Sequence, residues 1–247
     1  MRLDVFFSPN QVKPPDTQGR LVVIVDVLRA STTVATALGN GAKTVIPLEG
    51  PDDVITRSKE FARSQTLLAG EQKMHPITGF DLGNSPQAFT PEVVEGKTIL
   101  LTTTNGTRAL LGVQGARDIV VASYVNFTAV LTLMKVAASS NTDIAIICAG
   151  EEGGFTLEDA ACAGRYVKAI PKRAGLAVND AAAASVLIEK KYGDNIAKVF
   201  KESTHGQALQ SAGFGDDLAA AAEVDAYPVV PIWQDRQITK LGPERER

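Results

Sequence analysis

The sequence predicts a three-layer α/β/α protein in which helices cover both faces of a mostly parallel or mixed sheet. Apolar runs of strand length recur along the first part of the chain, and segments with helical spacing lie between them. The runs do not alternate apolar with polar residues, which is typical of strands that are buried on both faces. From Asn179 onward the pattern changes to short helical segments separated by glycine, which predicts a helical C-terminal part.

Strands and helices are expected to alternate over the first 170 or so residues, as in α/β proteins. The predicted strands are Leu21–Val27, Thr44–Leu48, Thr66–Ala69, Thr98–Thr103, Ile119–Ala122 and Asp143–Ala149. The predicted helices between and after them are Ser31–Leu38, Pro51–Ser64, Gly106–Leu111, Asn126–Ala138 and Thr156–Ala169.

The C-terminal part is expected to add short helices and then an extended segment. The helices are Asn179–Lys191, Asp194–Ser203, Gly206–Ala212 and Gly215–Ala222. Two prolines exclude a helix from Tyr227–Trp233 and favour an edge strand or an extended segment there. The charged end, Pro243–Arg247, is expected to be frayed.

The 247 residues are interpreted as a single α/β unit. Leu21–Thr33 and Ile99–Ala109 both run from an apolar strand through a polar turn into a helix, and each has an arginine next to an alanine. This similarity has two explanations, a duplicated βα unit or the strand–turn–helix unit that recurs in all α/β folds. The first would divide the chain into similar subdomains at about residues 1–95 and 96–247.

Composition excludes several classes of protein. Hydrophobic residues make up 45% and charged residues 21%, which suits a globular core. The net charge of −3 lacks the basic field of nucleic-acid binding, and no apolar run approaches the about 20 residues of a membrane span. Cys148 and Cys162 form no CxxC pair and are expected to be free thiols, which favours the cytoplasm. A homodimer is expected only because dimers are the commonest oligomers of soluble proteins.

The first candidate cluster is Asp26–Thr33, where an apolar strand opens into a helix. Ser31 or Thr32 is a good N-cap, and a helix N-terminus offers N–H groups to an anion. Arg29 adds a planar fork for phosphate or sulfonate, and Asp26 stands where a carboxylate could hold a metal. In the alternative, Ser31 only caps the helix while Asp26 and Arg29 form a local salt bridge.

The second cluster is Thr102–Arg108, which again follows an apolar strand. Asn105-Gly106 favours a tight turn and Thr107 could cap the next helix. Thr104 and the two threonines before it, Thr102 and Thr103, supply hydroxyl groups to a site. The alternative is a β-hairpin at Asn-Gly.

The third cluster is Cys148–Asp159, in which four carboxylates fall within nine residues. Thr156 with Asp159 makes a variant capping box, which accounts for Asp159 but not for Glu151 and Glu152. Mg²⁺ takes a few carboxylates together with water and substrate oxygens, so this loop is the best metal candidate.

Two shorter segments are expected to join the same crevice. Glu71 follows the strand Thr66–Ala69, and the loop Gly79–Pro86 contributes Asn84 and Ser85. In open α/β sheets, ligands bind outside the carboxyl ends of the strands, so these turns are predicted to gather at one rim of the sheet. Cations and hydroxyls would hold an anion there while carboxylates hold a metal, which is the equipment for metal-assisted phosphoryl transfer.

Several known phosphate-site patterns are absent. The chain has no GxxxxGK[ST] loop and no GxGxxG after a strand. Leu28 stands where the haloacid-dehalogenase pattern needs a second aspartate, and neither cysteine has an arginine six residues later.

Five ordered segments resemble the 2-phosphosulfolactate phosphatase family. They are VDVLRASTT, GEQ, GFDLGNSP, TTTNGTRAL and CAGEEGGFTLEDAACAG, followed by SxHG at Ser203–Gly206 and by the Asp216–Leu218 and Val230-Pro231 segments. The resemblance implies an acid-type, Mg²⁺-dependent phosphatase that converts 2-phospho-3-sulfolactate to 3-sulfolactate and phosphate, a step in coenzyme M biosynthesis.

The resulting hypothesis is metal-assisted hydrolysis of a small anionic phosphomonoester, in which either water or a side chain attacks. The catalytic candidates are Asp26, Arg29, Ser31, Glu71 and Glu152. The candidate metal ligands are Asp26, Glu71, Glu151, Glu152 and Asp159. The substrate-binding candidates are Arg29, Ser31, Thr32, Asn84, Ser85, Thr104, Asn105, Gly106 and His205.

His205 has two interpretations, a general acid or anion ligand, and a structural residue at a helix end. Three alternative functions remain open. They are a phosphatase for another phosphorylated hydroxy acid, an isomerase or lyase of phosphorylated acids, and a non-catalytic anion-binding protein.

Overall fold

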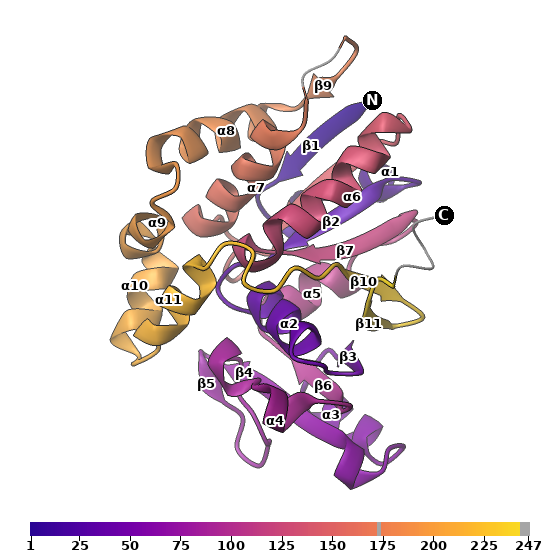
Figure 1. Ribbon diagram of the computed structural model, residues 1–247, viewed down its shortest axis with the longest axis vertical. Coiled ribbons are helices and arrows are strands. Elements are labelled where there is room, and N and C mark those ends of the chain that lie inside the picture. The colour runs from indigo at the N-terminus through magenta and orange to yellow at the C-terminus, as the bar shows by residue number, and fades with distance from the viewer. Residues whose placement is uncertain (172–173, 243–247) are drawn as a thin grey trace.

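The computed structural model describes residues 1–171 and 174–242, and in this part of the chain eleven strands form one mixed sheet between layers of helices (Figure 1). The predicted three-layer α/β/α class is confirmed. The strand order is β5-β4-β6-β3-β11-β10-β7-β2-β8-β1-β9. The predicted fraying of Pro243–Arg247 lies outside the described residues. No helix among the described residues has the length and apolar character to cross a membrane.

The strands are β1 Arg2–Phe6, β2 Leu21–Val25, β3 Thr44–Pro47, β4 Thr66–Gln72, β5 His75–Pro76, β6 Thr98–Thr102, β7 Asp118–Ala122, β8 Ile144–Cys148, β9 Ala177–Val178, β10 Pro231–Gln234 and β11 Gln237–Lys240. The α-helices are α1 Pro14–Thr17, α2 Ala30–Gly39, α3 Pro51–Ser58, α4 Pro91–Val94, α5 Gly106–Leu111, α6 Phe127–Ser139, α7 Leu157–Ala169, α8 Asp180–Tyr192, α9 Ile196–Glu202, α10 Thr204–Ser211 and α11 Gly215–Ala222.

All six predicted strands are present, and so are the predicted helices, of which Gly106–Leu111 and Gly215–Ala222 have the predicted ends and the others have shifted ends. The helix predicted over Pro51–Ser64 stops at Ser58. The extended segment predicted around Trp233 is β10, but the expectation of an edge strand is wrong because β10 lies between β7 and β11. Its proline, Pro231, is tolerated because it occupies the first position of the strand.

The sheet consists of two parallel sets that run in opposite directions. Strands β4, β6 and β3 are parallel to one another, and so are β7, β2, β8 and β1. The antiparallel hairpin β10–β11 joins them, with β10 against β7 and β11 against β3. Three antiparallel pairings separate β3 from β7, so the strands of one set point in the opposite direction to those of the other.

The two sets have the same internal plan. The order β7-β2-β8 matches β3-β6-β4, with β2 and β6 in the central positions. Helix α2 leads from β2 across to β3, while α5 leads from β6 across to β7. Each set therefore takes strands from both sides of residue 95, and the division into subdomains at that point stays a prediction.

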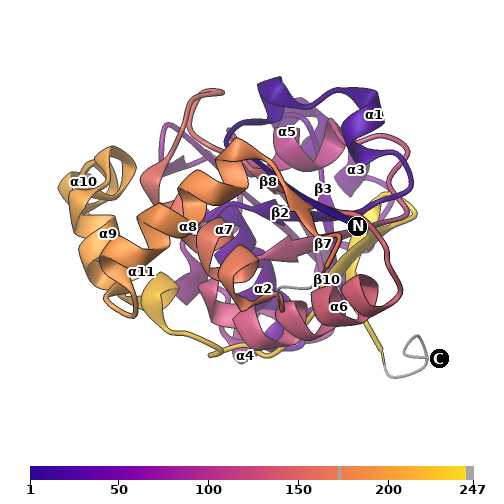
Figure 2. The same ribbon diagram turned by 90° about the horizontal axis from the view of Figure 1, so that it is seen from above.

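Helices cover both faces of the set around β2 (Figure 2). Val23 and Val25 face α6 and α7 in one buried cluster, whereas Val22 and Ile24 face α2 and α5 in another. Every residue of α2 except the last is buried. This burial fixes the start of α2 at the junction of the two sets. Cys148 and Cys162 are both free and buried, as predicted.

Candidate functional site

A cavity of about 1020 Å³ opens where the carboxyl ends of the two parallel sets meet. The prediction of a single rim is wrong in this respect, because β2 and β8 approach the cavity from one set and β4 and β6 from the other. The lining residues are Asp26, Leu28, Arg29, Glu49, Pro51, Glu71, Gln72, Lys73, Met74, His75, Asn84, Thr102, Thr103, Thr104, Asn105, Arg108, Glu151, Glu152 and His205.

Asp26 directly follows β2 and is 5% exposed. Its carboxylate accepts a hydrogen bond from Ala30 N at 3.1 Å, while its own N–H donates to Ser31 Oγ at 3.0 Å. Burial, together with the charges of Glu71 and Glu158, raises the pKa of Asp26 to about 6, although the charge of His205 and the hydrogen bond from the Ala30 amide both act to lower it. The start of α2 is thus already bound by a carboxylate, so its first amide is not free for an anion.

Thr103 has the same position after β6 as Asp26 has after β2. Its N–H donates to Thr107 Oγ1, and its hydroxyl accepts from Thr107 N, both at 3.1 Å. In both sets the residue after the strand accepts from a helix amide and donates to a helix hydroxyl. Thr103 makes both bonds with Thr107, whereas Asp26 makes them with Ala30 and Ser31. The predicted hairpin alternative at Asn105-Gly106 is wrong, because the chain enters α5 there.

Glu71 anchors two loops of the cavity through backbone amides. Its Oε1 accepts from Thr104 N at 2.8 Å and its Oε2 from Met74 N at 3.0 Å. Lys73 and Met74 form the two-residue turn between β4 and β5, with φ of 49° and 72°. Two positive φ angles at residues other than glycine are a strained choice for such a turn, and they place Lys73 at the cavity.

The loop after β8 brings Glu151 and Glu152 to the cavity. Glu152 N donates to Asn105 Oδ1 at 3.0 Å, which ties this loop to the one after β6. The turn needs glycine at Gly150, where φ is 65° and a Cβ atom would meet Gly154 O at 1.9 Å. Ser8 Oγ donates to Gly153 O at 2.7 Å and fixes the loop from outside.

Asp159 lies behind the cavity and is not among the lining residues described. Its Oδ1 accepts from Val27 N at 2.8 Å and its Oδ2 from Gly150 N at 3.1 Å. Burial, together with the charges of Asp26 and Glu158, raises the pKa of Asp159 well above its usual value. This arrangement gives Asp159 a clear structural task, joining the ends of β2 and β8.

Arg29 lines the cavity but its guanidinium is largely occupied. It contacts Asp217 Oδ2 at 2.7 Å, donates to Met74 O at 2.7 Å, and stacks 4.4 Å from the ring centre of Phe214. Ser85 Oγ donates to the other oxygen of Asp217 at 2.5 Å. Both α11 and the preceding loop are thereby attached to the start of α2, and the local Asp26–Arg29 pair considered from sequence is not formed.

His205 lies in the first turn of α10 and lines the cavity with 9% exposure. Its Nδ1 lies 3.1 Å from Oε1 of the buried Glu158. Burial lowers the pKa of His205, but the hydrogen bond and charge of Glu158, with the charges of Glu151 and Asp26, outweigh it and raise the pKa to about 8. Sequence reasoning missed Glu158 because its partner lies 47 residues away.

Asn84 is the part of the Gly79–Pro86 loop that reaches the cavity. It is 4% exposed and its Oδ1 finds no hydrogen-bond partner in the described part of the chain. Buried polar atoms are nearly always paired. An unpaired oxygen on the cavity wall is therefore an acceptor ready for a ligand donor or a water.

Five of the predicted site residues do not line the cavity in the described structure. Ser31 accepts from Asp26 N, and Thr32 donates to Val27 O at 2.7 Å, so both serve the start of α2. The full set is Ser31, Thr32, Ser85, Gly106 and Asp159. Lining residues that were not among the predicted site residues include Lys73, Arg108 and Glu49, whereas Thr102 and Thr103 belong to the predicted group of three threonines. Lys73 directly follows the motif GEQ and Arg108 lies within the motif TTTNGTRAL, so a search for cations in and beside the motifs would have found both.

The oxygen donors of the cavity fit Mg²⁺. Asp26 is a buried carboxylate that forms no ion pair with any described residue, and Glu71, Glu151 and Glu152 line the same space. Mg²⁺ needs only one or two carboxylates besides water and substrate oxygens. No three His, Cys, Asp or Glu side chains of the described residues already stand in ligand geometry. Asp26 with Glu151 or Glu152 would hold the ion, and Glu71 would orient the loops around it.

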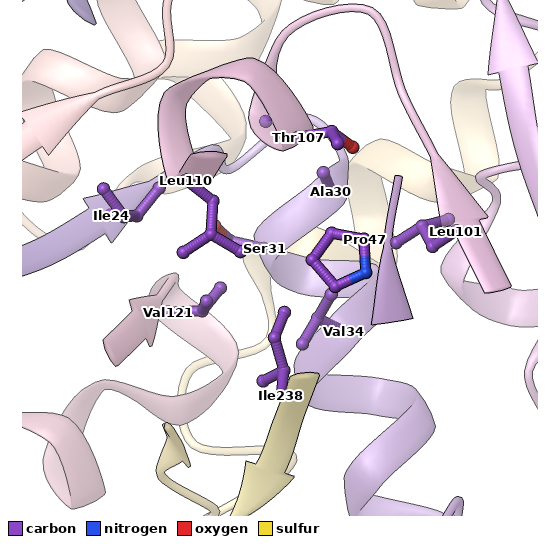
Figure 3. Close-up of a pocket in the computed structure, with 11 residues that line it drawn as sticks. Ile24, Ala30, Ser31, Val34, Pro47, Leu101, Thr107, Leu110, Val121 and Ile238 are labelled. Carbon is purple, nitrogen blue, oxygen red and sulfur yellow. The ribbon is translucent and has the colours of Figure 1, made fainter. Parts of the chain in front are cut away.

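A much smaller cavity, of about 20 Å³, lies behind the start of α2 (Figure 3). Val34, Leu110 and Ile238 are among its mostly apolar lining. The hydroxyls of Ser31 and Thr107, its polar lining groups, already accept the N–H groups of Asp26 and Thr103. The cavity therefore belongs to the packing between α2 and α5.

Known proteins are similar to this chain over all the segments that line the cavity. The family model described as 2-phosphosulpholactate phosphatase matches residues 6–236. A protein of Caldanaerobacter subterraneus subsp. tengcongensis named "Probable 2-phosphosulfolactate phosphatase" is 38% identical over 231 residues, covering 94% of this chain and 95% of its own. Proteins with the same name from Symbiobacterium thermophilum (38% over 232 residues, covering 92% and 98%) and Clostridium acetobutylicum (33% over 239 residues, covering 96% and 100%) are also similar.

Proposed function

The chain belongs to the 2-phosphosulfolactate phosphatase family, a family of phosphoric monoester hydrolases, and we propose that it hydrolyses 2-phospho-3-sulfolactate to 3-sulfolactate and phosphate with the help of Mg²⁺. The observation that supports this most strongly is the meeting of Asp26, Glu151 and Glu152 with Arg29 and further cations in one cavity. The names of the relatives supply the substrate. The place in coenzyme M biosynthesis and a cytoplasmic location are parts of the same proposal.

The residues divide between two tasks. Asp26 with Glu151 or Glu152 would hold the divalent ion, which when bound would supply positive charge to the phosphate oxygens. Arg29, fixed by Asp217 and Phe214, presents a preorganised positive edge to the cavity. A preorganised charge costs no rearrangement when negative charge develops during reaction.

His205 acts as the general acid that donates a proton to the leaving-group oxygen. With a pKa of about 8, it is mostly protonated at neutral pH. Glu158 holds Nδ1, so Nε2 is the ring nitrogen available to substrate. An alkoxide leaving group needs a proton, and a positioned acid contributes roughly 10²–10⁴-fold to such a step.

Released phosphate tests the proposal. Purified protein is incubated with 2-phospho-3-sulfolactate, 2-phospholactate and glycerol 2-phosphate, each with MgCl₂ and with EDTA. We expect fastest release from the sulfonate ester and loss of release in EDTA. Tight binding of these compounds with no phosphate released would instead favour a non-catalytic anion-binding protein. Conversion without phosphate release would favour an isomerase or lyase.

A further inference from the structure

The two parallel sets each bring one arginine to the cavity, and only one of the two is already bound. Arg29, at the start of α2, is buried against Asp217, Met74 O and the ring of Phe214. Arg108, in the first turn of α5, is exposed and also lines the cavity. Within residues 1–171 and 174–242, the Arg108 side chain makes no hydrogen bond or ion pair.

The cavity is rich in carboxylates, which repel anions. Its lining includes five carboxylate side chains, namely Asp26, Glu49, Glu71, Glu151 and Glu152. A divalent ion would offset some of this charge beside the phosphate. A second anionic group on the same small molecule would still lie among carboxylates and needs a cation of its own.

Shape cannot supply the selection. A cavity of about 1020 Å³ is at the upper end of ligand pockets, far larger than a three-carbon acid. Small phosphate esters with or without a second strong anion would therefore all enter. Discrimination among them has to come from charged contacts with the part of the substrate that does not react.

Arg108 is better suited to that contact than Lys73, the other exposed and unpaired cation of the lining. The loop before α5 is held at two points, by Glu71 through Thr104 N and by Glu152 N through Asn105 Oδ1. Arg108 follows that loop, on a helix. Lys73 lies on the two-residue turn between β4 and β5, whose Met74 is likewise held at two points, by Glu71 and by Arg29, so the choice between the two cations rests on the chemistry of their side chains. A guanidinium also offers two parallel N–H donors to an oxyanion, whereas an ammonium is a point charge.

We propose that Arg108 binds the second strong anion of the substrate, its sulfonate, and so determines the specificity of the enzyme. The inference rests on the proposed function, since it assigns a residue to the part of that substrate which is not hydrolysed. The phosphate then lies on the side of Asp26, Glu151 and Glu152, and the sulfonate on the side of α5.

Two substrates that differ only at this group test the assignment. Both 2-phospho-3-sulfolactate and 2-phospholactate carry the phosphate and the carboxylate, and only the first carries a sulfonate. The measured quantity is the ratio of their kcat/KM values for wild type, Arg108→Ala, Arg108→Lys, Lys73→Ala and Arg117→Ala. Arg117 is an exposed arginine that pairs with Asp118 at the opposite end of the strands, so its removal controls for net charge.

We expect Arg108→Ala to lower the ratio by about tenfold or more, the size of a lost charge-assisted hydrogen bond. Arg108→Lys should lower it less, and Arg117→Ala should leave it unchanged. An equal loss on both substrates with Arg108→Ala, or a larger fall in the ratio with Lys73→Ala, would overturn the assignment. Absence of phosphate release by wild type from either ester would contradict the proposed function instead.

Binding of the product gives a second measurement that does not depend on turnover. Calorimetric titration with 3-sulfolactate and with lactate compares the two product acids directly. We expect Arg108→Ala to weaken 3-sulfolactate binding about tenfold. Unchanged affinity in this variant, with the fold intact by circular dichroism, would contradict a contact between Arg108 and the sulfonate.

Discussion

Gly106 lies directly against Asp26 at the junction of the two parallel sets. A Cβ atom at position 106 would stand 2.5 Å from Asp26 Oδ2 and 2.7 Å from the Cβ of Ala30. Both neighbours are buried and belong to the start of α2. The first residue of α5 must therefore be glycine for the two helices to approach the cavity together.

Gly106→Ala is expected to damage both the fold and the site. The added methyl group must push α5 away from Asp26, and overpacking of this kind costs about 1–3 kcal/mol. Urea unfolding measures the stability, and phosphate release measures the site. Gly242→Ala is the control because nothing lies within 4 Å of a Cβ placed there. Wild-type stability and activity in Gly106→Ala would show that the junction is looser than the structure indicates.

Asp26→Asn separates the catalytic role of this carboxylate from its structural one. The amide oxygen can still accept from Ala30 N, so we expect the fold to remain while phosphate release falls by about 10²–10³-fold. Folding raises the pKa of Asp26 to about 6, so the folded protein binds more protons than the unfolded chain between about pH 4 and 6. Wild type without metal therefore loses stability as the pH rises through that window.

The asparagine variant lacks this titration. At pH 8 in EDTA it is expected to be more stable than wild type, as measured by urea unfolding. Retention of wild-type turnover in Asp26→Asn would refute the catalytic assignment, and a collapse of its stability would assign the residue to the fold alone.

Mg²⁺ binding has a readout besides activity. An ion that binds only the folded protein stabilises it by about 2.7 kcal/mol at one hundred times its Kd. We expect MgCl₂ to raise the melting temperature of wild type but not of Asp26→Asn, and to raise that of Glu152→Gln less. Sodium chloride at equal ionic strength controls for screening. Equal shifts in wild type and Asp26→Asn would place the ion elsewhere.

The sequence alone could predict the elements and much of the site. Strands such as Leu21–Val25 and Ile144–Cys148 are buried over their whole length. A strand of that kind is a continuous apolar run, which can be recognised from neighbouring residues in the sequence. The carboxylates Asp26, Glu71 and Glu152 were found because each follows such a run. The similarity between Leu21–Thr33 and Ile99–Ala109 also has a counterpart, since β2 and β6 occupy matching places in their sets.

The opposed direction of the two sets could not be predicted from local pattern. It depends on the pairing of β10 and β11 with strands more than 100 residues earlier in the chain, and hairpin Pro231–Lys240 gives no local sign of those partners. The side chains that hold Arg29 and His205 were missed for the same reason. Asp217 and Glu158 are 188 and 47 residues from their partners, and such contacts exist only after the chain has folded.

Asp217→Ala is expected to destabilise the protein severely. It leaves the buried guanidinium of Arg29 without its anion, and breaking one side of a buried ion pair costs about 3–5 kcal/mol. Ser85→Ala removes only one hydrogen bond to Asp217 and should cost about 1 kcal/mol. The exposed pair Arg57–Glu60 gives the matched control, since Glu60→Ala should cost under about 1 kcal/mol. Similar losses in Asp217→Ala and Glu60→Ala, measured in urea, would contradict a fixed Arg29.

His205 is expected to make the stability of the metal-free protein depend on pH above neutrality. Its folded pKa of about 8 lies above the ordinary value of 6.5, because Glu158 favours the charged ring more than burial opposes it. The stabilisation is therefore complete below about pH 6.5 and is lost as the pH rises through 8, and it amounts to at most about 2 kcal/mol. His205→Gln removes this dependence, so the difference in unfolding free energy between wild type and variant should shrink from pH 6 to pH 9 in EDTA. A difference that stays constant over this range would mean that Glu158 does not hold a protonated His205.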